Sequence, residues 1–132
     1  MRTSILCIML VVSFLTACQL LDTYMLPTYD QQIQHGKQLF YNGTVDTPAC
    51  SGCHIASNSE HRLYIAAPKL VGISNRAQVG QPTVSADEYL YQSIINPGVY
   101  LVEGFPNSMF PDYGIHLTDY DIRSLIAYLQ TL

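Results

Sequence analysis

The sequence contains no tryptophan, and only 12% of its 132 residues are charged, about half of the ~25% that is typical of soluble domains. Six Lys and Arg face ten Asp and Glu, which gives a formal net charge of −4. The chain therefore lacks the positive surface that binds nucleic acids, and we expect no nucleic-acid partner. Disorder is not favoured either, because ten Tyr and four Phe provide a large area to bury. The length suits one domain.

The N-terminal apolar run, residues 5–15, is too short to cross a membrane. It follows Arg2 and is typical of the core of a signal peptide. It leads into Leu15-Thr16-Ala17-Cys18, which resembles the lipobox of bacterial lipoproteins, where cleavage before the cysteine leaves that residue as the lipid-bearing N-terminus. The alternative is an ordinary cleaved signal that ends in a chance cysteine.

From this resemblance we predict a signal peptide over residues 1–17, a lipidated N-terminus and short tether over residues 18–29, and a folded domain over residues 30–132. The protein is then exported and held by the lipid on Cys18 at the extracytoplasmic face of a bacterial membrane, without spanning it. A disulfide framework is excluded, because Cys7 leaves with the signal and Cys18 takes the lipid, so that only Cys50 and Cys53 remain.

A first helix is predicted over residues 31–41, with Asp30 as its N-cap and Asn42-Gly43 as its left-handed stop. Gly36 inside this helix costs about 0.5 to 1 kcal/mol relative to Ala. Such a cost is understandable where another backbone approaches closely, although a merely tolerated glycine is the alternative.

Two further helices have clear start signals. Ser85 and Glu88 have the spacing of a capping box, and that helix should end near Ile95, before Pro97. The last helix begins at Thr118, and its apolar residues follow a helical period: Ile122, Leu125, Ile126 and Leu129. Residues 44–83 and 98–117 between the helices read as long loops. Three short helices bury too little by themselves, so a non-protein group is expected at the centre.

The segment Cys50-Ser51-Gly52-Cys53-His54 matches the attachment motif of c-type haem. Two thiols three positions apart on a turning backbone can reach the two vinyl groups at one porphyrin edge, and the adjacent imidazole then falls beneath the iron. A zinc site is the first alternative, but no second Cys pair or H-x3-5-H motif supplies further ligands. A thioredoxin-like redox pair is the second, but the chain shows no βαβ pattern.

From about residue 33 to the C-terminus the chain resembles the class I c-type cytochromes. Gly36 and Phe40 match the glycine and aromatic of that family's first helix, and Leu125 with Tyr128 resembles the face of the last helix that crosses it. Residues 67–72 (APKLVG) resemble the loop whose proline carbonyl receives the Nδ1 hydrogen of the proximal histidine. The resemblance therefore implies that Pro68 fixes the tautomer of His54, although a simple turn-forming role for this proline is the alternative.

The sixth iron ligand follows by elimination. After processing, only Met25 and Met109 remain, and Met25 lies in the tether. Met109 lies in a segment, residues 94–111, that looks like the methionine segment of class I cytochromes. It departs from the commoner Met-Pro sequence because Phe110 is inserted between Met109 and Pro111. A core gap-filling role for Met109 and ligation by His116 instead are the alternatives.

The remaining histidines and tyrosines receive no individual role in the site. His35 and His61 read as surface or helix histidines. Five tyrosines could pack on the porphyrin or bond a propionate, namely Tyr64, Tyr89, Tyr91, Tyr100 and Tyr113. Such residues are more often core residues whose hydroxyl group contacts water.

The resemblance implies an all-α small cytochrome c fold, with three main helices and long loops around one covalent haem c. It implies attachment through Cys50 and Cys53 and axial ligation by His54 and Met109. We predict one-electron transfer without substrate chemistry of its own, within a multi-subunit respiratory or photosynthetic membrane complex that provides the redox partners. The alternatives are a haem peroxidase or gas-binding sensor with a displaceable Met ligand, and a structural subunit whose haem serves as core.

Overall fold

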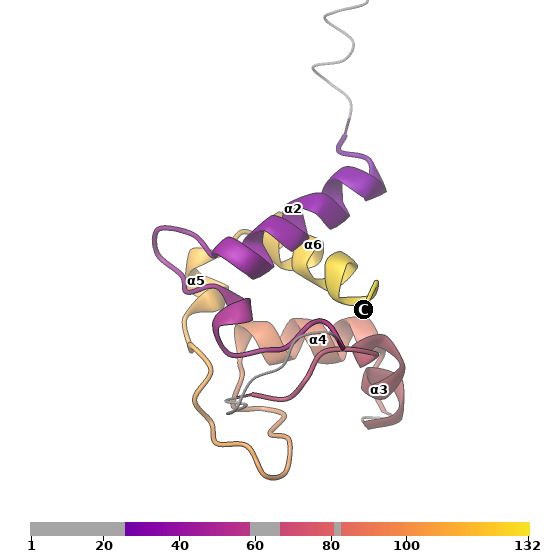
Figure 1. Cartoon of the computed structure of the whole chain (residues 1–132), viewed down its shortest axis with the longest axis vertical. Helices are drawn as coiled ribbons and strands as arrows, with labels where there is room; N and C mark the ends of the chain where they lie inside the picture. The colour runs from indigo at the N-terminus through magenta and orange to yellow at the C-terminus, as the bar shows by residue number, and fades with distance from the viewer. Residues whose placement is uncertain (1–25, 59–66, 81–82) are drawn as a thin grey trace, which may run out of the picture.

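The computed structural model describes residues 26–58, 67–80 and 83–132. Within these residues the chain is all-helical and contains no β-strand, as the predicted fold class requires. The elements are α2 (Tyr29–Asn42), the 3-10 helix η1 (Cys50–Gly52), α3 (Ile73–Gly80), α4 (Ala86–Ile95), α5 (Tyr113–His116) and α6 (Asp119–Leu129). Figure 1 shows α2 lying across α6, with α3 and α4 on the other side of α6.

The three predicted main helices are α2, α4 and α6, and one predicted cap is wrong. The N-cap of α2 is Thr28, not Asp30, because Thr28 and Gln31 form a reciprocal capping box. Asp30 instead lies in the first turn, where its carboxylate meets the positive end of the helix dipole. The helix ends as predicted, at Gly43 with a φ of 64°.

The other two helices start at the predicted N-caps, although the capping box predicted for α4 is only half formed. Ser85 accepts a hydrogen bond from the Glu88 N–H, but the Glu88 carboxylate accepts one from the Gln92 amide at 2.8 Å and does not bond the Ser85 N–H. Thr118 and Asp121 form a full capping box at the start of α6. All four apolar residues of the predicted α6 stripe are buried, and so is Tyr128.

The expectation of long helix-free loops is wrong in part. The stretch over residues 44–83 contains η1 and α3, and the stretch over residues 98–117 contains α5. These helices have three, eight and four residues, which is too short for the period of 3.6 to stand out in a window of about 11 to 18 residues.

Helices α2 and α6 approach each other closely at Gly36. A Cβ atom built on Gly36 would lie 1.8 Å from the backbone oxygen of Ser124 and 2.8 Å from the backbone nitrogen of Leu125. The crossing thus requires a glycine, which excludes the merely tolerated glycine that the sequence left open. Phe40, one turn further along α2, is 1% exposed in the same core cluster as Leu125 and Tyr128.

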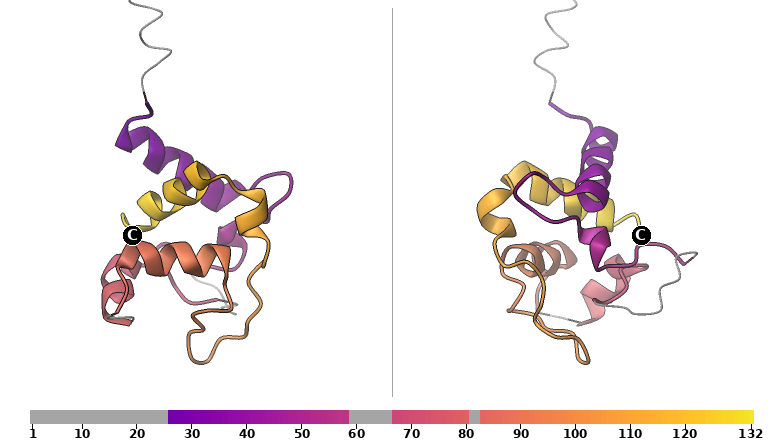
Figure 2. Two further views of the ribbon diagram at one scale, coloured as in Figure 1. Left: turned by 180° about the vertical axis from the view of Figure 1, so that it is seen from behind. Right: turned by 60° about the vertical axis from the view of Figure 1, so that its left-hand side comes forward.

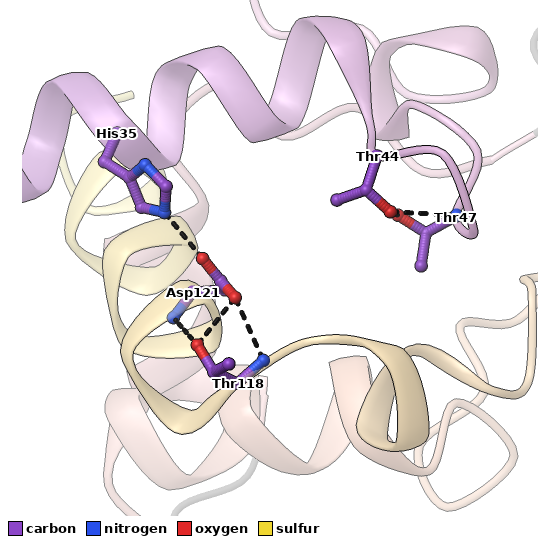
Figure 3. Close-up of polar contacts among 5 residues, drawn as sticks. All are labelled: His35, Thr44, Thr47, Thr118 and Asp121. Carbon is purple, nitrogen blue, oxygen red and sulfur yellow. Dashed lines mark hydrogen bonds and ion pairs between the residues drawn. The ribbon is translucent and has the colours of Figure 1, made fainter.

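A polar contact joins the same two helices beside the crossing (Figure 3). The Nε2 atom of His35 lies 2.6 Å from Oδ1 of Asp121, and the other carboxylate oxygen accepts hydrogen bonds from the Thr118 N–H and hydroxyl. Partial burial acts to raise the pKa of Asp121, but the hydrogen bonds from Thr118 and His35 outweigh it and lower that pKa. His35 is therefore a helix residue, as expected, but it also joins α2 to α6. His61 lies outside the described residues.

Candidate functional site

The Cys50–His54 segment starts with η1 and forms a tight turn. The N–H groups of Cys53 and His54 both donate to the carbonyl of Cys50, at 3.1 and 2.9 Å. Neither cysteine forms a disulfide, and both line a cavity of about 810 Å³. Burial raises the pKa of the Cys50 thiol to about 11.

His54 lies on the wall of the same cavity. Its Nδ1 atom is 2.8 Å from the carbonyl oxygen of Pro68. Because a carbonyl can only accept, the Nδ1 atom must carry the hydrogen and donate it. Burial lowers the pKa of His54 although the bond to Pro68 acts against this. The ring is thus neutral, and Nε2 is the nitrogen that can bind a metal.

Met109 lies in the loop between α4 and α5 and is half-buried. It lines the same cavity as Cys50, Cys53 and His54. His116, the rival ligand, is exposed on α5 and is not among the residues that line this cavity. Cys18 and Met25 lie outside the described residues.

The cavity has the size and lining that suit a large planar cofactor. Its volume falls within the range of about 300 to 1,000 Å³ that is common for ligand pockets. Apolar side chains from several segments line it, among them Ile73, Leu90, Phe105 and Phe110. Two thiols, a neutral imidazole and a thioether open onto one apolar space, and this donor set fits a haem that is attached through sulfur and ligated by nitrogen and sulfur.

Some tyrosines that the sequence left without individual roles belong to this site. Tyr89, Tyr100 and Tyr113 line the cavity, whereas Tyr91 lines a separate hollow beside α5, and Tyr64 lies outside the described residues. The Tyr113 hydroxyl donates to the carbonyl of Pro48 at 2.9 Å and also interacts with Cys50. Burial raises the pKa of Tyr113, so the hydroxyl keeps its proton.

Sequence reasoning missed Arg76. This side chain lines the cavity and donates to the backbone carbonyls of Lys69 and Val71. The sequence gives no signal for these contacts, because an arginine in a polar stretch is ordinarily a solvated charge.

The fold and this cavity define a small helical protein built around a covalently attached redox cofactor. A family model described as cytochrome c matches residues 33–132, and the chain belongs to the cytochrome c family. Members of this family carry covalent haem c, typically one per domain, so haem c is the cofactor. A search of curated proteins finds no match.

Family membership indicates the general function of the protein and the compartment in which such domains are found. It indicates an electron-transfer protein rather than a classical enzyme, and domains of this family are typically exported or extracytoplasmic. No helix in the described part of the chain has the length and hydropathy needed to cross a membrane. The described residues also contain no group of three or more His, Cys, Asp or Glu side chains that could hold a metal ion.

Proposed function

We propose that this protein is a lipid-anchored monohaem cytochrome c that passes single electrons within a membrane complex. Haem c, when bound, supplies an iron centre that alternates between two oxidation states by one electron. Cys50 and Cys53 would hold the group through thioether bonds, and His54 and Met109 would ligate its iron. With both of these side chains bound to the iron, substrates would have no access to the metal, so electron transfer is favoured over peroxidase or gas-sensing activity.

The observation that carries this proposal is the bond from His54 Nδ1–H to the Pro68 carbonyl. Partners of this kind orient a ligating histidine and raise its basicity. The bond leaves Nε2 of His54 as the ligating atom on a wall of the cavity that Met109 also lines. Phe105 and Phe110 line the same cavity as Met109, and we expect these apolar side chains to keep water from the thioether and to oppose additional positive charge.

Substitution of Met109 tests the ligand assignment. A thioether favours the reduced metal, so Met109→His should lower the midpoint potential and abolish the absorption band that arises from Met-sulfur charge transfer. Met109→Ala should leave an open position that binds added CO or cyanide readily. His116→Ala is the matched control and should change neither property. A Met109→Ala protein with the native spectrum and potential, beside a His116→Ala protein that has lost both, would show bis-His ligation instead.

The resting wild-type protein separates electron transfer from the catalytic alternative. Six-coordinate low-spin iron with the Met-sulfur band supports an electron carrier, whereas five-coordinate high-spin iron supports a peroxidase or gas sensor. A protein that exchanges no electrons with its complex on the turnover timescale would instead be a structural subunit.

The arrangement of the domain supports anchoring through Cys18. Helix α2 begins at the end of the domain that lies farthest from the loop carrying Met109, in both Figure 1 and Figure 2. About ten residues separate Cys18 from this helix and can reach roughly 35 Å when fully extended. An anchor there keeps the domain close to the membrane and directs the Met109 loop away from it, toward a redox partner.

Cys18→Ser tests the anchor. The variant should still acquire haem, because Cys18 lies more than thirty residues before the Cys50–His54 motif in the sequence, but it should be released from membranes or retain an uncleaved signal. Membrane fractionation and the mass of the N-terminal peptide measure both properties. A normally processed, membrane-bound variant would contradict lipidation. Copurification of the wild-type protein from gently solubilised membranes then tests whether it belongs to a complex.

A further inference from the structure

The face of α2 that packs on the core continues beyond the part of the helix that the domain covers. Its members follow one another at intervals of three or four residues and so share one side of the helix: Phe40, Gly36, Ile33 and Tyr29. Phe40 and Gly36 are buried and Ile33 is half-buried, whereas Tyr29 is 60% exposed. The first turn of α2 therefore presents an aromatic ring that the described part of the domain leaves largely uncovered.

A second exposed apolar side chain precedes this turn. Leu26 lies three residues before Tyr29 and is 88% exposed. Little charge surrounds the pair in the sequence, because residues 26–34 contain a single charged side chain, that of Asp30. The start of α2 forms one extremity of the domain in Figure 1 and in both views of Figure 2. We call Leu26 and Tyr29 the helix-start patch.

The helix-start patch lies where the proposed lipid-bearing segment joins the domain. Seven residues, 19–25, separate Cys18 from Leu26, and they can span roughly 25 Å when fully extended. Four of these residues are apolar, and Asp22 alone is charged. A lipid on Cys18 would keep the patch within this distance of the bilayer surface. Contact between patch and lipid is then intramolecular and needs little intrinsic affinity to form.

We propose that the helix-start patch docks on the lipid surface that holds the anchor, with the side chains of Leu26 and Tyr29 at the boundary between headgroups and acyl chains. This inference rests on the proposed lipidation of Cys18. A tyrosine suits that boundary, because its ring is apolar and its hydroxyl can remain in water. Docking holds the domain in one orientation instead of leaving it to rotate about its tether.

Thiol chemistry can test the contact, because the mature holoprotein in its proposed form has no free thiol. Its cysteines are either removed with the signal, lipidated or bound in thioethers: Cys7, Cys18, Cys50 and Cys53. Leu26→Cys then introduces one reactive thiol into the patch and leaves Tyr29 in place. Val45→Cys is the matched control, because Val45 is fully exposed in the loop that follows the other end of α2.

Each lipidated variant is added to preformed vesicles of phosphatidylethanolamine and phosphatidylglycerol, and mass spectrometry follows its reaction with a membrane-impermeant maleimide. The rate is divided by that of the same variant made without lipid, by Cys18→Ser behind an ordinary cleavable signal peptide. We expect this ratio to be at least about tenfold lower for Leu26→Cys than for Val45→Cys, because a thiol buried in the contact reacts only while the contact is open. Adding Tyr29→Asp to Leu26→Cys should restore most of the rate, since a carboxylate is costly to bury against lipid.

The outcomes separate failure of the contact from failure of the anchor. Equal ratios at positions 26 and 45 in lipidated, vesicle-bound protein overturn the docking and leave the anchor standing. A wild-type N-terminal peptide without lipid overturns the anchor, and the docking falls with it. Protection of position 26 in native membranes but not in pure lipid vesicles also overturns the docking, because a protein partner and not lipid then covers the patch.

Discussion

Replacement of Gly36 by alanine tests the crossing of α2 and α6 with the smallest possible change. The added Cβ would lie 1.8 Å from the Ser124 backbone oxygen, whereas ordinary contact begins at 3.4 Å. The neighbour is backbone and cannot rotate away, so the two helices must separate by about 1.6 Å, the difference between these distances. Even a gap of about 0.5 to 1 Å forfeits a quarter to a half of the dispersion energy between the separated atoms.

The expected magnitude follows from two opposing effects. Overpacking of a core typically costs about 1 to 3 kcal/mol, and a clash with backbone places Gly36→Ala in the upper part of that range. Alanine returns about 0.5 to 1 kcal/mol through its higher helix propensity. The net loss of about 2 kcal/mol corresponds to a fall in Tm of roughly 8 to 16 °C for a domain of this size.

Thermal unfolding of the holoprotein, followed by far-UV circular dichroism and by haem absorption, measures this fall. Gln38→Ala is the matched control, because Gln38 is exposed on the same helix and should change stability by no more than about 0.5 kcal/mol. An unchanged or higher Tm for Gly36→Ala would refute the reasoning, since the propensity gain would then outweigh the clash.

Two further predictions concern the same pair of helices. Ser124→Ala should raise the free energy of unfolding, measured by chemical denaturation, by about 0.5 to 2 kcal/mol. The Ser124 hydroxyl is buried without a hydrogen-bond partner among the described residues, and an unsatisfied buried group costs about 1 to 3 kcal/mol. A less stable variant would show that the hydroxyl has a partner. Asp121→Asn should cost most stability near neutral pH. The lowered pKa of Asp121 means that its contribution is complete above the unfolded-state pKa of about 3.9 and is lost as the pH falls through the folded-state value. Denaturation of both proteins between pH 7 and pH 3 should show the difference shrinking toward low pH, and a constant difference would contradict the linkage.

The sequence by itself determined the features that depend on neighbouring residues. The spacing of Cys50, Cys53 and His54 predicts the attachment motif without reference to the fold, because five adjacent residues form it. The capping box at Thr118 and the apolar stripe of α6 were predictable for the same reason, since caps and helical faces involve residues only three to seven positions apart. The glycine in α2 indicated a close approach, and only the resemblance to class I cytochromes implied that the last helix is the element that approaches it.

Only the tertiary structure decided the contacts between distant parts of the chain. Gly36 meets Ser124, and His35 meets Asp121 across 86 positions, because two helices cross at one particular point. Such contacts arise from packing that buries apolar surface from the whole domain, and no short window of sequence contains both partners.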